Sequence, residues 1–138
     1  MSVVATLDVS NVARLDLTMR RGTAWTITCR LTNGTSASNP GTAVSLAGCA
    51  VRGDVRPSAN SSTATATLSG SVTDASDGQH TVEMTTVESE KPSANGATAT
   101  DSTDYVWTAE VYNTTTAAVL CTLTGTLSVF PKAPEATP

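Results

Sequence analysis

The sequence predicts an all-β protein built as an antiparallel β-sandwich or barrel, and three observations support this. Apolar and polar residues alternate with a period of two through much of the chain, which is typical of strands with one buried face. Threonine, whose branched side chain favours strands, is the most frequent residue. About eight or nine short strands follow at a spacing of roughly 8–12 residues, with no significant helix. A jelly roll also fits, because strand order is not readable from the pattern.

The clearest alternation lies in two strands, residues 14–20 and 24–31, hinged on Arg21-Gly22. The glycine supplies the backbone freedom that a turn requires. Residues 1–13 precede these strands and are predicted as an N-terminal arm or a leading strand. The domain itself is predicted over residues 14–131.

The rest of the domain is divided by turn residues. Residues 32–42 are rich in Asn, Gly, Ser and Pro and are predicted as a loop, Pro57 ends a strand, and Asp77-Gly78 suits a tight hairpin turn. Residues 88–103 are polar and lack apolar periodicity, which predicts a long loop. Residues 44–46 are predicted to re-enter the core. The further strands are predicted at 49–56, 63–69, from Val72 to the Asp77-Gly78 turn, and at 79–87, 105–111, 119–123 and 125–130. The prolines after these strands predict an extended tail at 132–138.

Because aromatic residues make up only 4% of the chain, the core must form around a few large side chains. We expect the two tryptophans to link the two sheets, because each buries about 200 Å². The expected core anchors are Leu17, Trp25, Ile27, Tyr105 and Trp107.

The three cysteines, Cys29, Cys49 and Cys121, lie at wide spacing on the inward faces of predicted strands. We interpret them as small buried hydrophobic residues in a reducing compartment. A Cys29–Cys121 disulfide between the sheets is the alternative. A zinc site would need paired ligands at short spacing, and His80 is the single histidine.

The charge pattern argues against nucleic acid and membrane as partners. The formal net charge is −4, and the basic residues Arg20 and Arg21, with Arg14 nearby, are not interleaved with stacking aromatics. No apolar run approaches the ~20 residues that span a bilayer. The first residues lack the basic and apolar regions of a secretory signal, so we expect synthesis in the cytoplasm without export.

The sequence shows no constellation that points to catalysis, and we expect no enzyme, cofactor or metal. His80 shares a strand face with Val82 and Met84, which favours a packed histidine over a catalytic base. The segment 74–78 lacks the alternating oxygen ligands of a calcium loop. Six acidic residues lie in or beside turns, where solvation explains them better than paired glycosidase chemistry does; they are Asp74, Asp77, Glu88, Glu90, Asp101 and Asp104.

Five short motifs, in order, carry a family resemblance. They are RGTAW at 21–25, VSLAGC at 44–49, VRP at 55–57, YVW at 105–107 and LTGTLSV at 123–129. The order resembles the amino-terminal immunoglobulin-like domain of bacteriophage baseplate upper proteins and tail-fibre adaptors. The resemblance spans about residues 14–131 and implies an immunoglobulin-like sandwich.

The resemblance also implies a function and a location. It implies a non-enzymatic structural protein of a phage virion, made in the host cytoplasm, that acts as a tail, baseplate or fibre-attachment module. Its partners would be other virion proteins, and it would form a homo-oligomer within a symmetric assembly. A capsid decoration protein that stabilises the phage head is the alternative, and a cell-surface adhesion domain is a more distant one.

If assembly is the function, the arm 1–13 and the loop 88–103 are the expected contact surfaces. Edge strands and arms pair with neighbouring subunits by strand addition. We expect that deleting either segment leaves a folded domain that does not enter particles. The expected contact residues are Val3, Val4, Leu7, Lys91, Asn95 and Thr98.

Overall fold

The structure is a computed structural model that describes residues 2–8, 12–32, 42–94 and 101–131, with the backbone alone for residues 2–8 and 12–13. These residues contain nine strands and two single helical turns. In chain order the elements are β1 (Ser2–Asp8), β2 (Val12–Arg14), β3 (Leu17–Arg20), β4 (Trp25–Thr32), β5 (Cys49–Arg56), β6 (Ala66–Asp74), η1 (Ala75–Asp77), β7 (Gln79–Met84), α1 (Thr86–Ser89), β8 (Thr103–Asn113) and β9 (Val119–Phe130).

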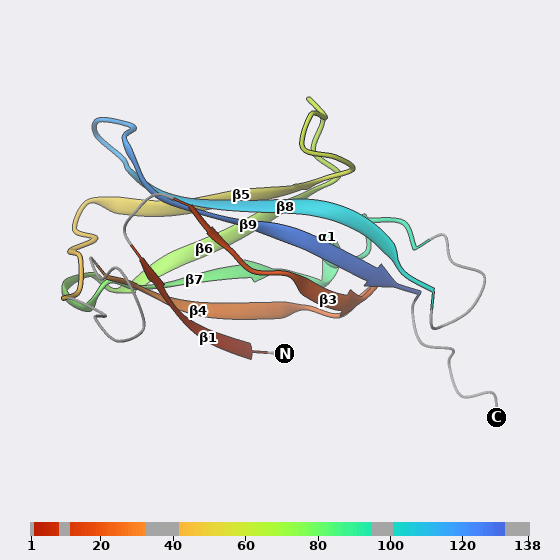
Figure 1. The fold of residues 1–138 in the computed structure, drawn as a ribbon, viewed down its shortest axis with the longest axis horizontal. Coiled ribbons are helices and arrows are strands. Elements are labelled where there is room, and N and C mark those ends of the chain that lie inside the picture. Colours follow the sequence, from red (N-terminus) through yellow and green to blue (C-terminus); the bar gives the residue numbers. More distant parts are fainter. Residues whose placement is uncertain (1, 9–11, 33–41, 95–100, 132–138) are drawn as a thin grey trace.

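The strands stack in two layers (Figure 1). One layer has the order β1-β4-β7-β6, and the other has the order β5-β8-β9, with β2 and β3 on the outer edge of β9. The orders β4-β7-β6 and β5-β8-β9 match strands B-E-D and C-F-G of an immunoglobulin sandwich. The predicted all-β, immunoglobulin-like sandwich is therefore confirmed, in preference to a jelly roll.

The sandwich is antiparallel, as predicted, except at the two ends of the strand order. β1 runs parallel to β4, and β2 and β3 run parallel to β9. For β3, the reason lies in the Arg21-Gly22 turn, where Gly22 has a φ of 88°. This turn carries the chain from β3 in one layer to β4 in the other, so the two strands do not form a hairpin. Strands that are not joined by a hairpin are free to pair in parallel.

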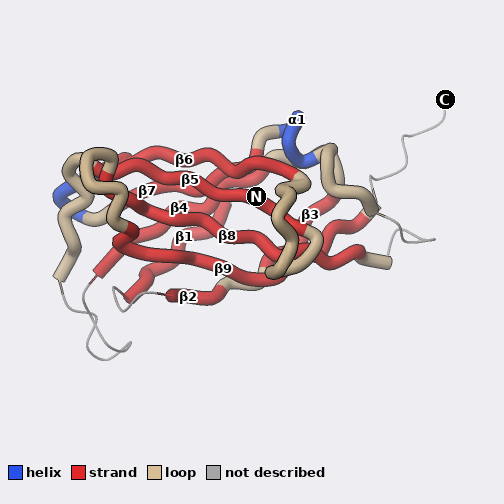
Figure 2. Tube along the Cα trace, turned by 90° about the horizontal axis from the view of Figure 1, so that it is seen from above, coloured by secondary structure: helices blue, strands red, loops and turns tan. Residues whose placement is uncertain are grey.

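β6 is one strand where the sequence predicts two, residues 63–69 and a short strand from Val72. Its first residues pair with β5 and its later residues pair with β7, so β6 passes from one layer to the other and joins them along one side (Figure 2). The crossing requires a glycine, because a Cβ on Gly70 would overlap the carbonyl oxygen of Thr81.

β9 also unites two predicted strands, residues 119–123 and 125–130. Gly125 lies at the middle of β9, where the backbone of the segment between β2 and β3 passes very close. The indole Nε1–H of Trp107 donates to the carbonyl oxygen of Leu15 at 2.9 Å, and a Cβ on Gly125 would overlap that same oxygen.

The core lies between the two layers and is built from alternate residues of the strands. The ring centroids of Trp25 on β4 and Trp107 on β8 lie 6.2 Å apart with the planes at 76°, an edge-to-face contact that links the layers. All five expected anchors are buried: Leu17, Trp25, Ile27, Tyr105 and Trp107.

Tyr105 adds a second link at the corner between β7 and β8. Its hydroxyl donates to the carbonyl oxygen of Ser93 at 2.7 Å. A tyrosine at the start of this strand that bonds back to upstream backbone is the tyrosine corner of immunoglobulin sandwiches. Trp107 stands two residues later, at the position of the strand-F cysteine in antibody domains.

Helix is confined to the two single turns among the described residues, as the sequence predicts. The carboxylate of Asp74 accepts from the backbone N–H of Asp77 and so caps η1, and Gly78 ends it with a φ of 69°. The predicted tight hairpin at Asp77-Gly78 is therefore wrong in detail, because the chain makes a capped 3-10 turn there.

Candidate assembly surfaces

The N-terminal strand β1 is one end of the strand order, and among the described residues its strand partner is β4. In the parallel register, Val3 lies beside Ile27 and Leu7 lies beside Leu31. The expected contact residues Val3, Val4 and Leu7 are thus placed on an edge strand, and their side chains lie outside the described residues. The arm predicted at 1–13 is strand over 2–8 and 12–14.

The expected contact loop 88–103 differs from the prediction in its first half. Ser89 is buried, and its carbonyl oxygen accepts from the backbone N–H of Gly22 at 3.3 Å. The carbonyl oxygen of Glu90 accepts from Nε of Arg21 at 2.9 Å. Residues 88–94 therefore form a packed corner against the β3–β4 turn.

This packing also changes what a deletion of the loop should do. Removing 88–103 would remove Ser93, the acceptor of the Tyr105 hydroxyl, and the first strand residue of β8, Thr103. We therefore expect that deleting the whole loop lowers the stability of the domain, in contrast to the expectation from the sequence. Lys91 is exposed, with its Nζ 2.6 Å from a carboxylate oxygen of Glu88. The other two expected contact residues, Asn95 and Thr98, lie outside the described residues.

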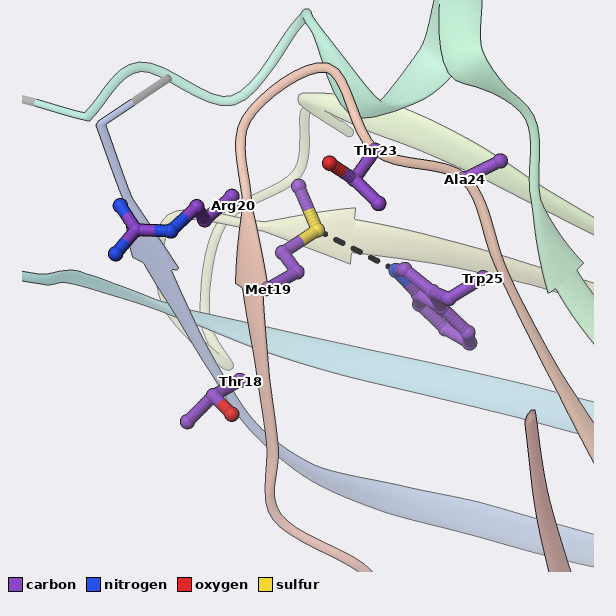
Figure 3. Close-up of a pocket in the computed structure, with 6 residues that line it drawn as sticks. All are labelled: Thr18, Met19, Arg20, Thr23, Ala24 and Trp25. Atoms are coloured by element: carbon purple, nitrogen blue, oxygen red, sulfur yellow. Dashed lines mark hydrogen bonds between the residues drawn. The ribbon is translucent and has the colours of Figure 1, made fainter. Parts of the chain in front are cut away.

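A mostly apolar cavity of about 220 Å³ opens at the end of the sandwich where β3 turns into β4. It is lined by Thr18, Met19, Arg20, Thr23, Ala24 and Trp25. Figure 3 shows the side chains of Met19 and Trp25 pointing toward each other beneath the turn, while Arg20 points to the other side of β3. The indole Nε1–H of Trp25 donates to Sδ of Met19 at 3.3 Å. A thioether sulfur is a weak acceptor, so this buried N–H is poorly satisfied.

The outer face of β5 and β8 carries charged residues that the sequence reasoning did not single out. The guanidinium of Arg52 lies 4.1 Å from the ring centroid of Tyr112, and its Nη2 lies 3.2 Å from a carboxylate oxygen of Glu110. The signal in the sequence is the alternation of polar residues in these strands. Only the pairing of β5 with β8 brings the three side chains together.

Asp54 and Arg56 continue this face along β5. Nη2 of Arg56 donates to Oδ2 of Asp54 at 2.8 Å, and its Nη1 donates to the carbonyl oxygen of Ser61 at 2.6 Å. The hydrogen bond to Asp54 and the charge of that carboxylate raise the pKa of Arg56. A shallow depression of about 320 Å³ lies here, lined by Arg52, Gly53, Asp54, Arg56, Thr108 and Glu110. Because each of the two arginines is paired with a carboxylate, this face is polar with balanced charge.

His80 is a packed core histidine, as the sequence predicts. Its side chain is buried on β7, and Nδ1 lies 3.2 Å from the carbonyl oxygen of Gly78. Burial lowers the pKa of His80, because a charged imidazolium is poorly solvated there.

Two of the acidic residues near the turns, Asp74 and Asp77, serve local structure. Asp74 caps η1. Asp77 accepts from Nε of Arg30 at 3.1 Å and from Gln79 at 2.7 Å, and these two hydrogen bonds lower the pKa of its carboxyl. In the part of the chain that the structure describes, no group of three or more His, Cys, Asp or Glu side chains is placed to hold a metal ion.

All three cysteines are free thiols. Burial raises the pKa of Cys29 to about 12, with a further contribution from the nearby Cys121, and burial raises the pKa of Cys121 to about 11. Cys49 is half-buried. These observations agree with the prediction of small core residues, and the alternative of a Cys29–Cys121 disulfide is not formed in the structure.

Comparison with known proteins returns solved structures of low similarity. No family model and no curated protein matches the chain. Among solved structures, that of the NK cell receptor NKp44, a triggering partner in natural cytotoxicity, is 14% identical, with 86% of this chain and 96% of that chain covered at a TM-score of 0.37. PbICP-C, solved in complex with falcipain-2, is 10% identical, with 94% and 99% covered at a TM-score of 0.39. No described helix is both long and apolar enough to cross a membrane.

Proposed function

We propose that the chain is a non-enzymatic assembly module of a bacteriophage particle, and that it joins its neighbours through the edge strand β1. The resemblance of its motifs to phage baseplate and tail-fibre adaptor domains supports the phage assignment. The tail or baseplate is the favoured location, and the capsid surface is the second candidate.

The observation that carries the proposal is the composition of β1. Edge strands are usually protected from pairing with other chains by lysine, proline, bulges or short length. β1 reads SVVATLD over seven residues, so it has neither lysine nor proline, and its single charge is at its last residue. An edge of this kind suits strand addition, in which main-chain hydrogen bonds to a second subunit supply the affinity.

The outer face of β5 and β8 is a second surface in keeping with a structural role. Arg52 and Arg56 are held by carboxylates of the same face, and an exposed ion pair of this kind contributes at most about 1 kcal/mol. Such a face is well solvated when it is exposed to water, and it also suits a polar, hydrogen-bonded contact between subunits.

The test is particle assembly with a chain that lacks residues 2–8. Particles are produced with the full-length chain or with this deletion, purified, and their content of the chain is measured by quantitative mass spectrometry. We expect the full-length chain in the particles and at least a tenfold lower content of the deletion. Near-UV circular dichroism of Trp25 and Trp107 checks that the deletion variant is folded.

A matched control replaces Thr114 and Thr115 with alanine in the exposed turn before β9, far from β1 in the strand order. We expect this variant to enter particles normally. Absence of the full-length chain from purified particles would refute the phage assignment, and normal entry of the folded deletion variant would refute the role of β1. A few tens of copies per particle would place the chain in the tail, and hundreds would place it on the capsid.

A further inference from the structure

We propose that the cavity beside Trp25 binds the C-terminal segment of the same chain, residues 132–138. Three observations lead to this occupant: the chemistry of the cavity wall, the place where the described chain ends, and the composition of the residues that follow. The inference does not depend on the proposed assembly function.

The cavity wall is mostly apolar, and one of its residues, Trp25, carries a buried indole N–H. Met19 and Trp25 form its apolar wall, and the Trp25 N–H is aimed at a weakly accepting sulfur. A backbone carbonyl oxygen accepts a hydrogen bond far better than a thioether does. At about 220 Å³, the cavity has room for about seven water molecules at ~30 Å³ each, which is enough for a proline ring and part of its backbone.

The last described residue, Pro131, is in contact with a residue that lines this cavity. Nη1 of Arg20, a lining residue, donates to the carbonyl oxygen of Pro131 at 3.2 Å, and the backbone N–H of Arg21 donates to that of Phe130 at 3.0 Å. Pro131, the last described residue, therefore lies beside the side chain of Arg20, which points away from Met19 in Figure 3. Seven extended residues reach about 23 Å, which is enough to cross a single strand.

The composition of the segment suits the cavity. It reads KAPEATP, with two prolines and two alanines, so it favours the extended polyproline II conformation and leaves its carbonyl oxygens available to donors. Aromatic-lined grooves bind segments of this kind because little conformational entropy is lost. Glu135 carries a charge opposite to that of Arg20, which lines the cavity. Attachment to the same chain gives an effective concentration in the millimolar range, so a weak contact suffices.

The experiment follows the two indole N–H signals in ¹H–¹⁵N NMR spectra of the protein. We compare the full-length chain with a chain that ends at Pro131. The expected result is that the Trp25 indole signal moves on truncation by more than its line width. The Trp107 indole signal should stay in place, because its N–H is bonded to Leu15 in the core, and it serves as an internal check of folding.

Two further measurements test the occupant. A synthetic peptide of residues 131–138, added to the truncated chain, should return the Trp25 signal saturably to its full-length position, and a peptide with Glu135→Lys should bind several-fold more weakly. The variant Ala24→Leu, which fills the cavity from an exposed lining position, should shift the full-length Trp25 signal and abolish the effect of truncation.

Either of two results would overturn the inference. One is a Trp25 signal that is the same with and without residues 132–138. The other is a truncation effect that depends on protein concentration, which would mean that the segment of a second copy fills the cavity.

Discussion

The substitution Gly125→Ala should destabilise the fold far more than its small size implies. The methyl group would overlap the carbonyl oxygen of Leu15, so the segment between β2 and β3 must move away from β9. That segment carries the acceptor for Trp107 and two further hydrogen bonds to β9. The effect is therefore the loss of a local network, rather than the effect of one added methyl group.

The magnitude follows from the three hydrogen bonds that this segment makes. The backbone N–H of Leu15 donates to Thr124 at 2.8 Å, and that of Thr126 donates to Asp16 Oδ1 at 2.9 Å. Each contributes about 1 kcal/mol. The indole N–H of Trp107, a residue with no exposed surface, would lose its acceptor, and an unsatisfied buried donor costs about 1–3 kcal/mol. We expect a total loss of about 3–5 kcal/mol, a large part of the ~5–15 kcal/mol that stabilises a typical domain.

The assay is urea unfolding at pH 7.5, followed by tryptophan fluorescence and analysed by linear extrapolation. The matched control is Gly48→Ala. Gly48 has a φ of 73°, but an added Cβ there meets no atom within 4 Å, so only backbone strain of about 1–2 kcal/mol is expected.

The reasoning would be refuted if Gly125→Ala cost no more than Gly48→Ala. A second check is a double-mutant cycle with Trp107→Phe, which removes the indole donor beforehand. In that background Gly125→Ala should cost about 1–3 kcal/mol less than in the wild-type chain, because the donor is already absent. Equal costs in both backgrounds would show that the Trp107 bond is not the link.

Three further predictions concern single side chains. Tyr105→Phe should lower the free energy of unfolding by about 1 kcal/mol in urea, because it deletes the hydrogen bond to Ser93, and an unchanged value would mean that this corner does not contribute. Because burial lowers the pKa of His80, its neutral form contributes stability that is complete above pH ~6.5 and is lost as pH falls below that value. The free energy of unfolding of the wild type should therefore decrease between pH 7.5 and pH 5.5. The variant His80→Gln should lack this part of the decrease. In the native protein at pH 8, a thiol reagent should react rapidly with the half-buried Cys49 alone, because the raised pKa values of the buried Cys29 and Cys121 suppress their thiolates. The variant Cys49→Ser should therefore lack the rapid phase of the reaction.

The sequence was sufficient for the strands whose alternation is strong. The run from Trp25 to Leu31 and the run from Tyr105 to Val111 both bury every second residue in the structure. This succeeds because the alternation of side chains across a pleated strand is a local property of the backbone. The packed state of His80 followed from the same alternation, since it shares the buried face of β7 with Val82 and Met84.

The sequence was not sufficient for two of the candidate surfaces, the outer face of β5 and β8 and the cavity beside Trp25. The outer-face group of Arg52, Glu110 and Tyr112 exists because β5 and β8 pair in one particular register. The cavity beside Trp25 is lined by residues on both sides of the Arg21-Gly22 turn, which leads from one layer to the other. Register and layer depend on contacts between residues far apart in the chain, which a single sequence does not display.

The sequence by itself determined the all-β class, the inward faces of the strong strands and the large residues of the core, since each depends on the period-two pattern of neighbouring residues. Tertiary structure decided that β1, β2 and β3 pair in parallel, that β6 joins the two layers, and that residues 88–94 form a packed corner. The physical reason is that these features depend on which backbone groups meet across the fold. Gly70 and Gly125 are ordinary small residues in the sequence, and only the neighbouring carbonyl groups of Thr81 and Leu15 show why no side chain fits there.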